Sequence, residues 1–203
     1  MALNMFGVTV NDAHMAQVHV ADTMLVAVRD LAAICGPTEY RAQDLDDGSI
    51  ARHTEVIGAY VARGPILPAP VGVVFRSDEH VQRWLQLHYS ALTEALSFVE
   101  NRSAARVHIS RAPGTEAVIA GVDVDAVAAD ALRALRRAAV ATLPLRTERA
   151  PGLVLSAAFL VEQELWEKFV AAVEEQSKAG TGVHYHLTGP WPPYDFVQMQ
   201  LGA

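Results

Sequence analysis

The chain has 203 residues, of which 51% are hydrophobic and 19% are charged, and its formal net charge is −7. This apolar content suffices for one large core or two smaller ones, which excludes a generally disordered chain. No apolar run approaches the roughly 20 residues of a membrane-spanning helix. Acidic side chains outnumber basic ones, and the sequence lacks the run of basic residues that binding to nucleic-acid phosphates requires. We therefore expect neither a lipid membrane nor a nucleic acid as a partner.

Cysteine usage and the first residues of the chain indicate the cellular compartment. Cys35 is the single cysteine, so it can form no internal disulfide, and we expect it to be an inert buried thiol. Residues 1–8 have neither the basic start nor the long apolar stretch of a secretory signal. Both observations favour a protein of the reducing cytoplasm.

Strand-forming side chains dominate the start of the chain. The stretches 5–10, 17–20 and 24–28 predict three short strands. Residues 30–34 predict a helical turn that the following Gly-Pro pair ends, and a polar connection leads on to residue 48.

Two helices separated by an extended segment complete the first half. Ser49 is a suitable N-cap for a helix that runs to about residue 62. Residues 65–75 are predicted to be extended, because their closely spaced prolines remove backbone donors and disfavour helix. A capping sequence at residues 77–80 then predicts one long helix to about residue 100. Its expected buried stripe consists of Val81, Leu85, Leu92, Leu96 and Val99.

The second half alternates strands and helices in a recognisable order. Strands are predicted over 105–110, 145–149, 153–161 and 183–187, and helices over 122–142 and 162–177. The order strand, helix, strand, strand, helix, strand is that of a ferredoxin-like domain, an antiparallel sheet with both helices on one face. Right-handed crossovers place the last strand beside the first, and the apolar strand over 153–161 belongs inside the sheet.

The predicted fold class is therefore α+β with two domains. Residues 1–102 are expected to form a smaller α+β domain. Residues 103–203 are expected to form the ferredoxin-like βαββαβ domain, which ends in a proline-rich aromatic segment.

That final segment reads Leu187-Thr-Gly-Pro-Trp-Pro-Pro-Tyr-Asp-Phe196. Its prolines fix an extended backbone with few free donors, which can hold Trp191 and Tyr194 against a surface. Two interpretations remain open: a tail that covers the last strand and fills a groove in its own domain, or an element that docks a partner. We define the terminal element as Gly189, Pro190, Trp191, Pro192, Pro193, Tyr194 and Phe196.

The segment closely resembles the terminal signature of the gas-vesicle protein L/F family, accessory proteins of a buoyancy organelle. The resemblance covers most of the chain from residue 49. Ser49-Ile-Ala-Arg-His53, Gly64-Pro-Ile-Leu-Pro68 and Gly72-Val-Val-Phe75 are similar to the family's N-terminal helix and proline turn. In one departure, Pro70-Val71 stands where members usually carry a basic and an aromatic residue.

The resemblance implies a cytoplasmic, non-enzymatic protein that associates with the gas vesicle as an assembly factor or minor wall component. The implied partner is the small hydrophobic shell protein, together with other gas-vesicle accessory proteins. A water-excluding shell subunit needs shielding before assembly, which an apolar docking area or a free sheet edge can provide. We expect Pro68 and Gly72 to shape the N-terminal turn and the terminal element to support the docking surface. We expect no catalytic residue, no cofactor and no metal.

Four polar residues of the second half support an alternative. Arg106 and His108 project away from the apolar set of the first predicted strand, as His184 and His186 do on the last. If these strands are neighbours, three imidazoles meet on the open sheet face, where they could in principle bind zinc. The alternative function is thus a ferredoxin-like metal- or small-molecule-binding protein or enzyme. The plainer interpretation is a polar face that packs on the N-terminal domain, and a self-associating scaffold is a third possibility.

Overall fold

The computed structural model describes residues 1–41, 45–112, 123–146 and 151–197. Its fold is mixed α+β with two antiparallel sheets, which confirms the predicted class. The chain divides into two compact units: unit 1 comprises Met1–Asn101 and the chain end from Pro192, and unit 2 comprises Arg102–Trp191. The terminal element, which we expected in the second domain, is therefore divided between the two units.

The sheet of unit 1 is built around β1, which pairs with three other strands. The strand order is β2-β3-β1-β4, and β5 also pairs with β1. The strands are β1 (Ala2–Val10), β2 (Met24–Val28), β3 (Leu31–Thr38), β4 (Ile66–Pro68) and β5 (Val74–Phe75). The register between β1 and β3 shifts between Met5 and Gly7, which places a β-bulge at Phe6. Because of the bulge, Met5 and Val8 face the same core although they are three residues apart.

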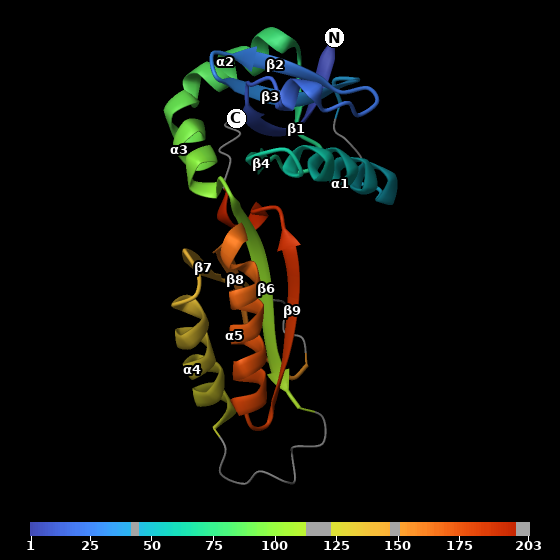
Figure 1. Cartoon of the computed structure of the whole chain (residues 1–203). Coiled ribbons are helices and arrows are strands. Elements are labelled where there is room, and N and C mark those ends of the chain that lie inside the picture. The colour runs from blue at the N-terminus through green and yellow to red at the C-terminus, as the bar shows by residue number, and fades with distance from the viewer. Residues whose placement is uncertain (42–44, 113–122, 147–150, 198–203) are drawn as a thin grey trace. The chain divides into compact units, whose positions relative to one another are not determined.

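Helices cover both faces of this sheet (Figure 1). On one face, α2 (Asp78–Leu87) and α3 (Tyr89–Val99) form a core with side chains of β1 and β3. On the other face, α1 (Asp47–Val61) packs against Phe6 and Ile34. Unit 1 thus has a helix layer, a sheet and a second helix layer.

Two predictions for the start of unit 1 are wrong. Residues 17–20 form no strand, because the 3-10 turn η1 (Met15–Gln17) leads into irregular chain there. The helical turn predicted over 30–34 lies instead within β3, whose residues 32–35 are fully buried. A short apolar run that is buried on both faces has no periodicity that would separate a strand from a helix.

The helix boundaries of unit 1 also differ from the predictions. The N-cap of α1 is Asp46, whose carboxylate accepts a hydrogen bond from the Ser49 N–H at 2.7 Å. The predicted long helix is two helices that meet at His88 (φ −102°, ψ 11°). The apolar period continues across this break, so the pattern did not mark it. The five residues of the stripe predicted for the long helix are all buried, which confirms that part of the prediction.

The sheet of unit 2 has the order β7-β8-β6-β9, with every pair antiparallel. Its strands are β6 (Arg102–Arg111), β7 (Ala141–Pro144), β8 (Leu153–Glu162) and β9 (Val183–Trp191). The last strand lies beside the first and β8 lies inside the sheet, as predicted. The helices α4 (Val124–Arg136) and α5 (Trp166–Ala179) lie together on one face (Figure 1), where they enclose the second core.

The connection between α4 and β8 differs most from the prediction in unit 2. α4 ends at Arg136, six residues before the predicted helix end at residue 142. The strand that follows is β7, which lies before the strand predicted over 145–149. Alanine is frequent on both sides of the helix end, so composition does not mark it. Pairing of β7 with the inner strand β8 decides the conformation of residues 141–144 over their weak helix preference. Residues 147–149 of the predicted strand lie outside the described residues.

Two further expectations concern burial and membranes. Cys35 is fully buried, and burial raises the pKa of its thiol to about 12, so the sulfur stays protonated and unreactive at neutral pH. Within the described ranges, no helix has both the length and the apolar character needed to cross a bilayer.

Candidate functional site

The unit 2 part of the terminal element forms the end of β9. Gly189, Pro190 and Trp191 extend this strand beyond its predicted end at residue 187. Gly189 has φ 134°, and a Cβ there would lie 2.8 Å from both the Ala104 carbonyl oxygen and the Trp166 ring. Only glycine permits this close approach of β9 to β6.

Trp191 presents a large aromatic side chain to solvent. Its side chain is 49% exposed, and its Nε1–H donates a hydrogen bond to Thr188 Oγ1 at 3.1 Å. The single donor of the indole is therefore satisfied within β9. The exposed ring surface is available for apolar contact.

From Pro192 onward, the terminal element belongs to unit 1. Pro193 is buried, and η4 (Tyr194–Phe196) is a 3-10 turn in which the Tyr194 N–H donates to the Pro192 carbonyl at 2.8 Å. Tyr194 is 38% exposed, and burial of the remainder raises the pKa of its hydroxyl. Val197 packs against the core beneath α2 and α3. These residues thus pack in unit 1, and not in the domain to which the sequence analysis assigned them.

Pro68 and Gly72 belong to the connection between β4 and β5. Pro68 is buried at the end of β4. Gly72 has φ 87°, a left-handed conformation that favours glycine. Backbone hydrogen bonds of 2.8 Å join Ala69 and Val73 to β1, so the connection is fixed at both ends. This connection follows one wall of a pocket.

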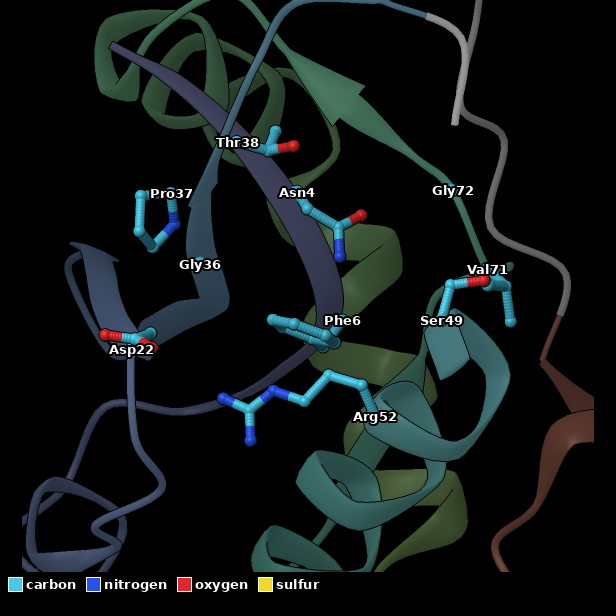
Figure 2. Close-up of a pocket in the computed structure, with 10 residues that line it drawn as sticks. All are labelled: Asn4, Phe6, Asp22, Gly36, Pro37, Thr38, Ser49, Arg52, Val71 and Gly72. Carbon is cyan, nitrogen blue, oxygen red and sulfur yellow. The ribbon is translucent and has the colours of Figure 1, made fainter. Parts of the chain in front are cut away.

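The pocket has a volume of about 290 Å³ and lies within unit 1 (Figure 2). Residues of β1, β3 and the start of α1 line it, together with the turn at Gly72. Ser49 and Arg52 come from the first of the N-terminal segments that carry the family resemblance, and Gly72 from the third. Two segments that are separated in the sequence therefore meet at one place.

The polar groups of the pocket are unevenly satisfied. Arg52 Nη1 is 2.9 Å from Glu55 Oε2, and its Nη2 donates to the Ala21 carbonyl. In contrast, Asn4 Oδ1 is buried and has no hydrogen-bond partner among the described residues. Asp22 also lines the pocket and has φ 53°. The pocket therefore combines a guanidinium that is already paired with one buried acceptor, Asn4 Oδ1, that has no donor among the described residues.

This pocket was not predicted from the sequence, although one signal for it is present. Gly36 was interpreted as the end of a helical turn, but it lies inside β3. A Cβ at Gly36 would lie 2.9 Å from the Asp22 carbonyl oxygen and 3.1 Å from the Phe6 ring. An isolated glycine in a strand marks such a close approach. That signal required the strand to be recognised first.

His53 on α1 is a second polar group without a partner. Its side chain is 3% exposed, and neither ring nitrogen has a hydrogen-bond partner within the described ranges. The ring lies 5.7 Å from the Phe6 ring, measured between centroids. Burial lowers the pKa of His53 below its usual value, against a smaller opposite effect of the Ala69 backbone, which lies near the ring without reaching hydrogen-bond geometry. The imidazole is therefore neutral at pH 7 and packs between helix and sheet.

The polar face expected in the second half lies on the adjacent strands β6 and β9, which carry Arg106 and His108, and His184 and His186, respectively. His108 lies opposite His186, with 6.2 Å between ring centroids. His108 Nδ1 is also 2.8 Å from the hydroxyl of Ser156 on β8, a partner that the sequence analysis did not predict. Burial lowers the pKa of His108, and electrostatic repulsion from the neighbouring His186 and Arg106 lowers it further.

This face has limited chemical capacity. Among the residues that the structure describes, no group of three or more His, Cys, Asp or Glu side chains is placed to hold a metal ion. The neutral His108 ring and the Ser156 hydroxyl satisfy each other. The arrangement is that of a hydrogen-bonded polar sheet face.

Comparisons with known proteins point to one family. The family described as gas vesicle synthesis protein GvpL/GvpF matches residues 5–123 and 122–198. Gas vesicle protein F2 of Halobacterium salinarum is 27% identical, over 88% of this chain and 81% of that protein. Gas vesicle protein L of a Streptomyces species is 30% identical, over 83% of this chain and 80% of that protein.

Two solved structures share the fold. The crystal structure of gas vesicle protein GvpF from an Anabaena species has a TM-score of 0.80 at 14% identity, over 98% of this chain and 99% of that one. The GvpF structure from Microcystis aeruginosa has a TM-score of 0.77 at 12% identity, with the same coverage. At these identities the likeness concerns the fold.

Proposed function

This chain belongs to the GvpL/GvpF family of gas vesicle synthesis proteins, and from that premise we propose that it binds the hydrophobic gas-vesicle shell protein, as an assembly factor or as a minor structural component. Its role is related to the gas vesicle. The observation that carries the proposal is the family match, which extends over nearly the whole chain. Other gas-vesicle accessory proteins are further proposed partners, and the proposed location is the cytoplasm, at the gas vesicle.

The chemistry of a shell protein explains why such a partner is needed. A subunit that excludes water on one surface exposes apolar area until it is assembled, and exposed apolar patches lead to aggregation. A protein that covers this area must itself offer aromatic or aliphatic surface in a fixed position, because ordering a mobile segment on binding costs free energy.

The terminal element has these properties. Trp191 and Tyr194 are among the exposed large hydrophobic side chains, at 49% and 38%. Each half of the element is anchored within its own unit, since Gly189 lies tightly against β6 in unit 2 and Val197 packs in the core of unit 1. Between these points, two consecutive prolines restrict the chain further. We propose that the terminal element, with Pro68 and Gly72 shaping the N-terminal turn, supports the docking surface.

The architecture proposed for the second domain is ferredoxin-like. The strand order β7-β8-β6-β9 and the position of α4 and α5 on one face support it. We propose residues 1–102 and 103–203 as the two domains, with the refinement that residues from Pro192 return to unit 1.

Copurification tests the proposed binding. The tagged chain and the shell protein are coexpressed, and the captured shell protein is quantified. Trp191→Ala is expected to lower capture by about tenfold or more, because a buried tryptophan is a typical binding hot spot. The matched control is Leu87→Ala, which removes another exposed apolar side chain, 78% exposed on α2.

Two results would contradict the proposal. One is no capture of shell protein by the unmodified chain. The other is equal capture by Trp191→Ala and Leu87→Ala, which would remove the terminal element from the contact. Circular dichroism of both variants verifies that they fold, and light scattering of the chain alone distinguishes a monomer from a self-associating scaffold.

A further inference from the structure

The pocket of unit 1 contains acceptors that lack donors. Asn4 Oδ1 is buried, lines the pocket and has no hydrogen-bond partner among the described residues. Asp22 lines the pocket as well; it is exposed, and its carboxylate has no ion pair or hydrogen bond among the described residues. A buried acceptor without a partner costs free energy, which a donor on a ligand would recover.

The charges near the pocket favour a cation. Arg52 lines the pocket, but its guanidinium is already occupied by Glu55 and by the Ala21 carbonyl. The N-terminus of α1, which would otherwise attract an anion, already has the Asp46 carboxylate as its cap. Hydrogen bonds from Ser49 lower the pKa of Asp46, so this group stays ionised at neutral pH. The carboxylates of Asp22 and Asp46 would repel an incoming anion and attract a cation.

We propose that this pocket binds a guanidinium group, carried on an arginine side chain of a partner segment. A guanidinium has several donors in a fixed plane, so one of them can serve the buried Asn4 Oδ1, while its positive charge is attracted by the Asp22 carboxylate on the opposite side of the pocket (Figure 2). Phe6, Pro37 and Val71 also line the pocket. The Phe6 ring lies between Asn4 and Arg52 (Figure 2), where it offers apolar surface to the methylene stem of such a side chain.

The size and walls of the pocket fit one side chain. Its 290 Å³ corresponds to the liquid volume of about ten water molecules. Gly36 and Gly72 leave bare backbone at its edge. All residues that line the pocket belong to unit 1, so binding of a guanidinium there does not depend on the gas-vesicle role.

A titration of the full chain, followed by NMR, tests the proposal. The probe is N-acetylarginine amide, and the comparison is N-acetylcitrulline amide, which has nearly the same shape but no charge. We expect saturable shifts of the Asn4 side-chain amide and of the Gly36 and Gly72 backbone amides. The arginine probe should bind about tenfold more tightly than the citrulline probe, because hydrogen bonds of charged groups are stronger.

Two variants should change the affinity for the arginine probe in opposite directions. Asp22→Asn should weaken it about fivefold, and asparagine tolerates the positive φ at this position. Asn4→Asp should strengthen it by adding a negative charge. The control is Glu174→Gln, which removes an exposed carboxylate from α5 in unit 2 and should leave affinity unchanged. If Asn4 and Asp22 had a purely structural role, Asn4→Asp would not increase the affinity for the arginine probe.

Three outcomes would overturn the proposal. The first is tighter binding of N-acetylglutamate amide than of the arginine probe, which would make the pocket an anion site. The second is equal affinity for the arginine and citrulline probes. The third is the absence of saturable shifts with the arginine probe up to its highest concentration, which would leave the pocket without this ligand.

Discussion

Unit 1 and unit 2 both pack helices on an antiparallel sheet, but they treat buried polar side chains differently. In unit 2, the ring of His108 is hydrogen-bonded to the Ser156 hydroxyl. In unit 1, the ring nitrogens of His53 and the Oδ1 of Asn4 are buried without a partner among the described residues. Folded proteins satisfy nearly all such groups, so the exceptions require an explanation. We infer that unit 1 carries the cost of two unpartnered polar side chains, Asn4 at the pocket and His53 in the core, whereas the His108–Ser156 pair of unit 2 carries no such cost.

The largest expected effect tests the packing of unit 2. Gly189→Ala should destabilise the protein by about 3 kcal/mol, because the new Cβ meets the Ala104 carbonyl and the backbone conformation favours glycine. The matched control is Gly58→Ala in α1, where nothing lies within 4 Å of the new Cβ. It should stabilise by about 0.5–1 kcal/mol. Urea unfolding measures both, and equal stabilities of the two variants would contradict the close packing at Gly189.

The next effect concerns the unsatisfied histidine of unit 1. His53→Leu should stabilise the protein by about 1–2 kcal/mol at pH 7, because an apolar side chain replaces two ring nitrogens without partners. Hydrogen exchange of α1 measures the effect locally. A loss of stability at pH 7 would mean that the imidazole makes a contact that the described residues do not show.

The corresponding substitution in unit 2 should have the opposite sign. Ser156→Ala should destabilise by about 1 kcal/mol, because it leaves His108 Nδ1 without its hydrogen bond. Ser110→Ala, on the same sheet face, is the control and should stay within about 0.5 kcal/mol of the unmodified chain. If both substitutions have the same effect, the two units do not differ in the way proposed.

The smallest expected effect is a change in pH dependence. The pKa of His53 is lowered in the folded protein, so below pH 6.5 the unfolded chain binds more protons and stability falls as pH drops. His53→Leu should reduce this loss, measured by urea unfolding at pH 7.5 and 5.5. Part of the loss should persist, because the pKa of His108 is lowered as well. An unchanged loss in His53→Leu would exclude His53 as its source.

The sequence predicted unit 2 better than unit 1, for a physical reason. In unit 2, the apolar strand over 153–161 and the alternating strands on either side of it have distinct periods, which indicate both conformation and sheet position. In unit 1, β3 is buried on both faces and has no period, and the bulge at Phe6 interrupts that of β1. Local pattern cannot reveal either feature.

The candidate sites show the same division. The terminal element and the histidines at 108, 184 and 186 could be found because each forms a compact pattern in the sequence. The pocket could not, since Asn4, Asp22, Gly36 and Arg52 meet only after the sheet has formed. The return of the chain to unit 1 after Trp191 likewise depends on the tertiary packing of residues such as Val197.

The central claim is that this chain assists gas-vesicle formation through contact with the shell protein. The most direct measurement is deletion of its gene in a vesicle-forming host, followed by electron microscopy and complementation. We predict that vesicles are lost or malformed, that the unmodified chain and Leu87→Ala restore them, and that Trp191→Ala does not. Normal vesicles in the deletion strain, or full restoration by Trp191→Ala, would contradict this account.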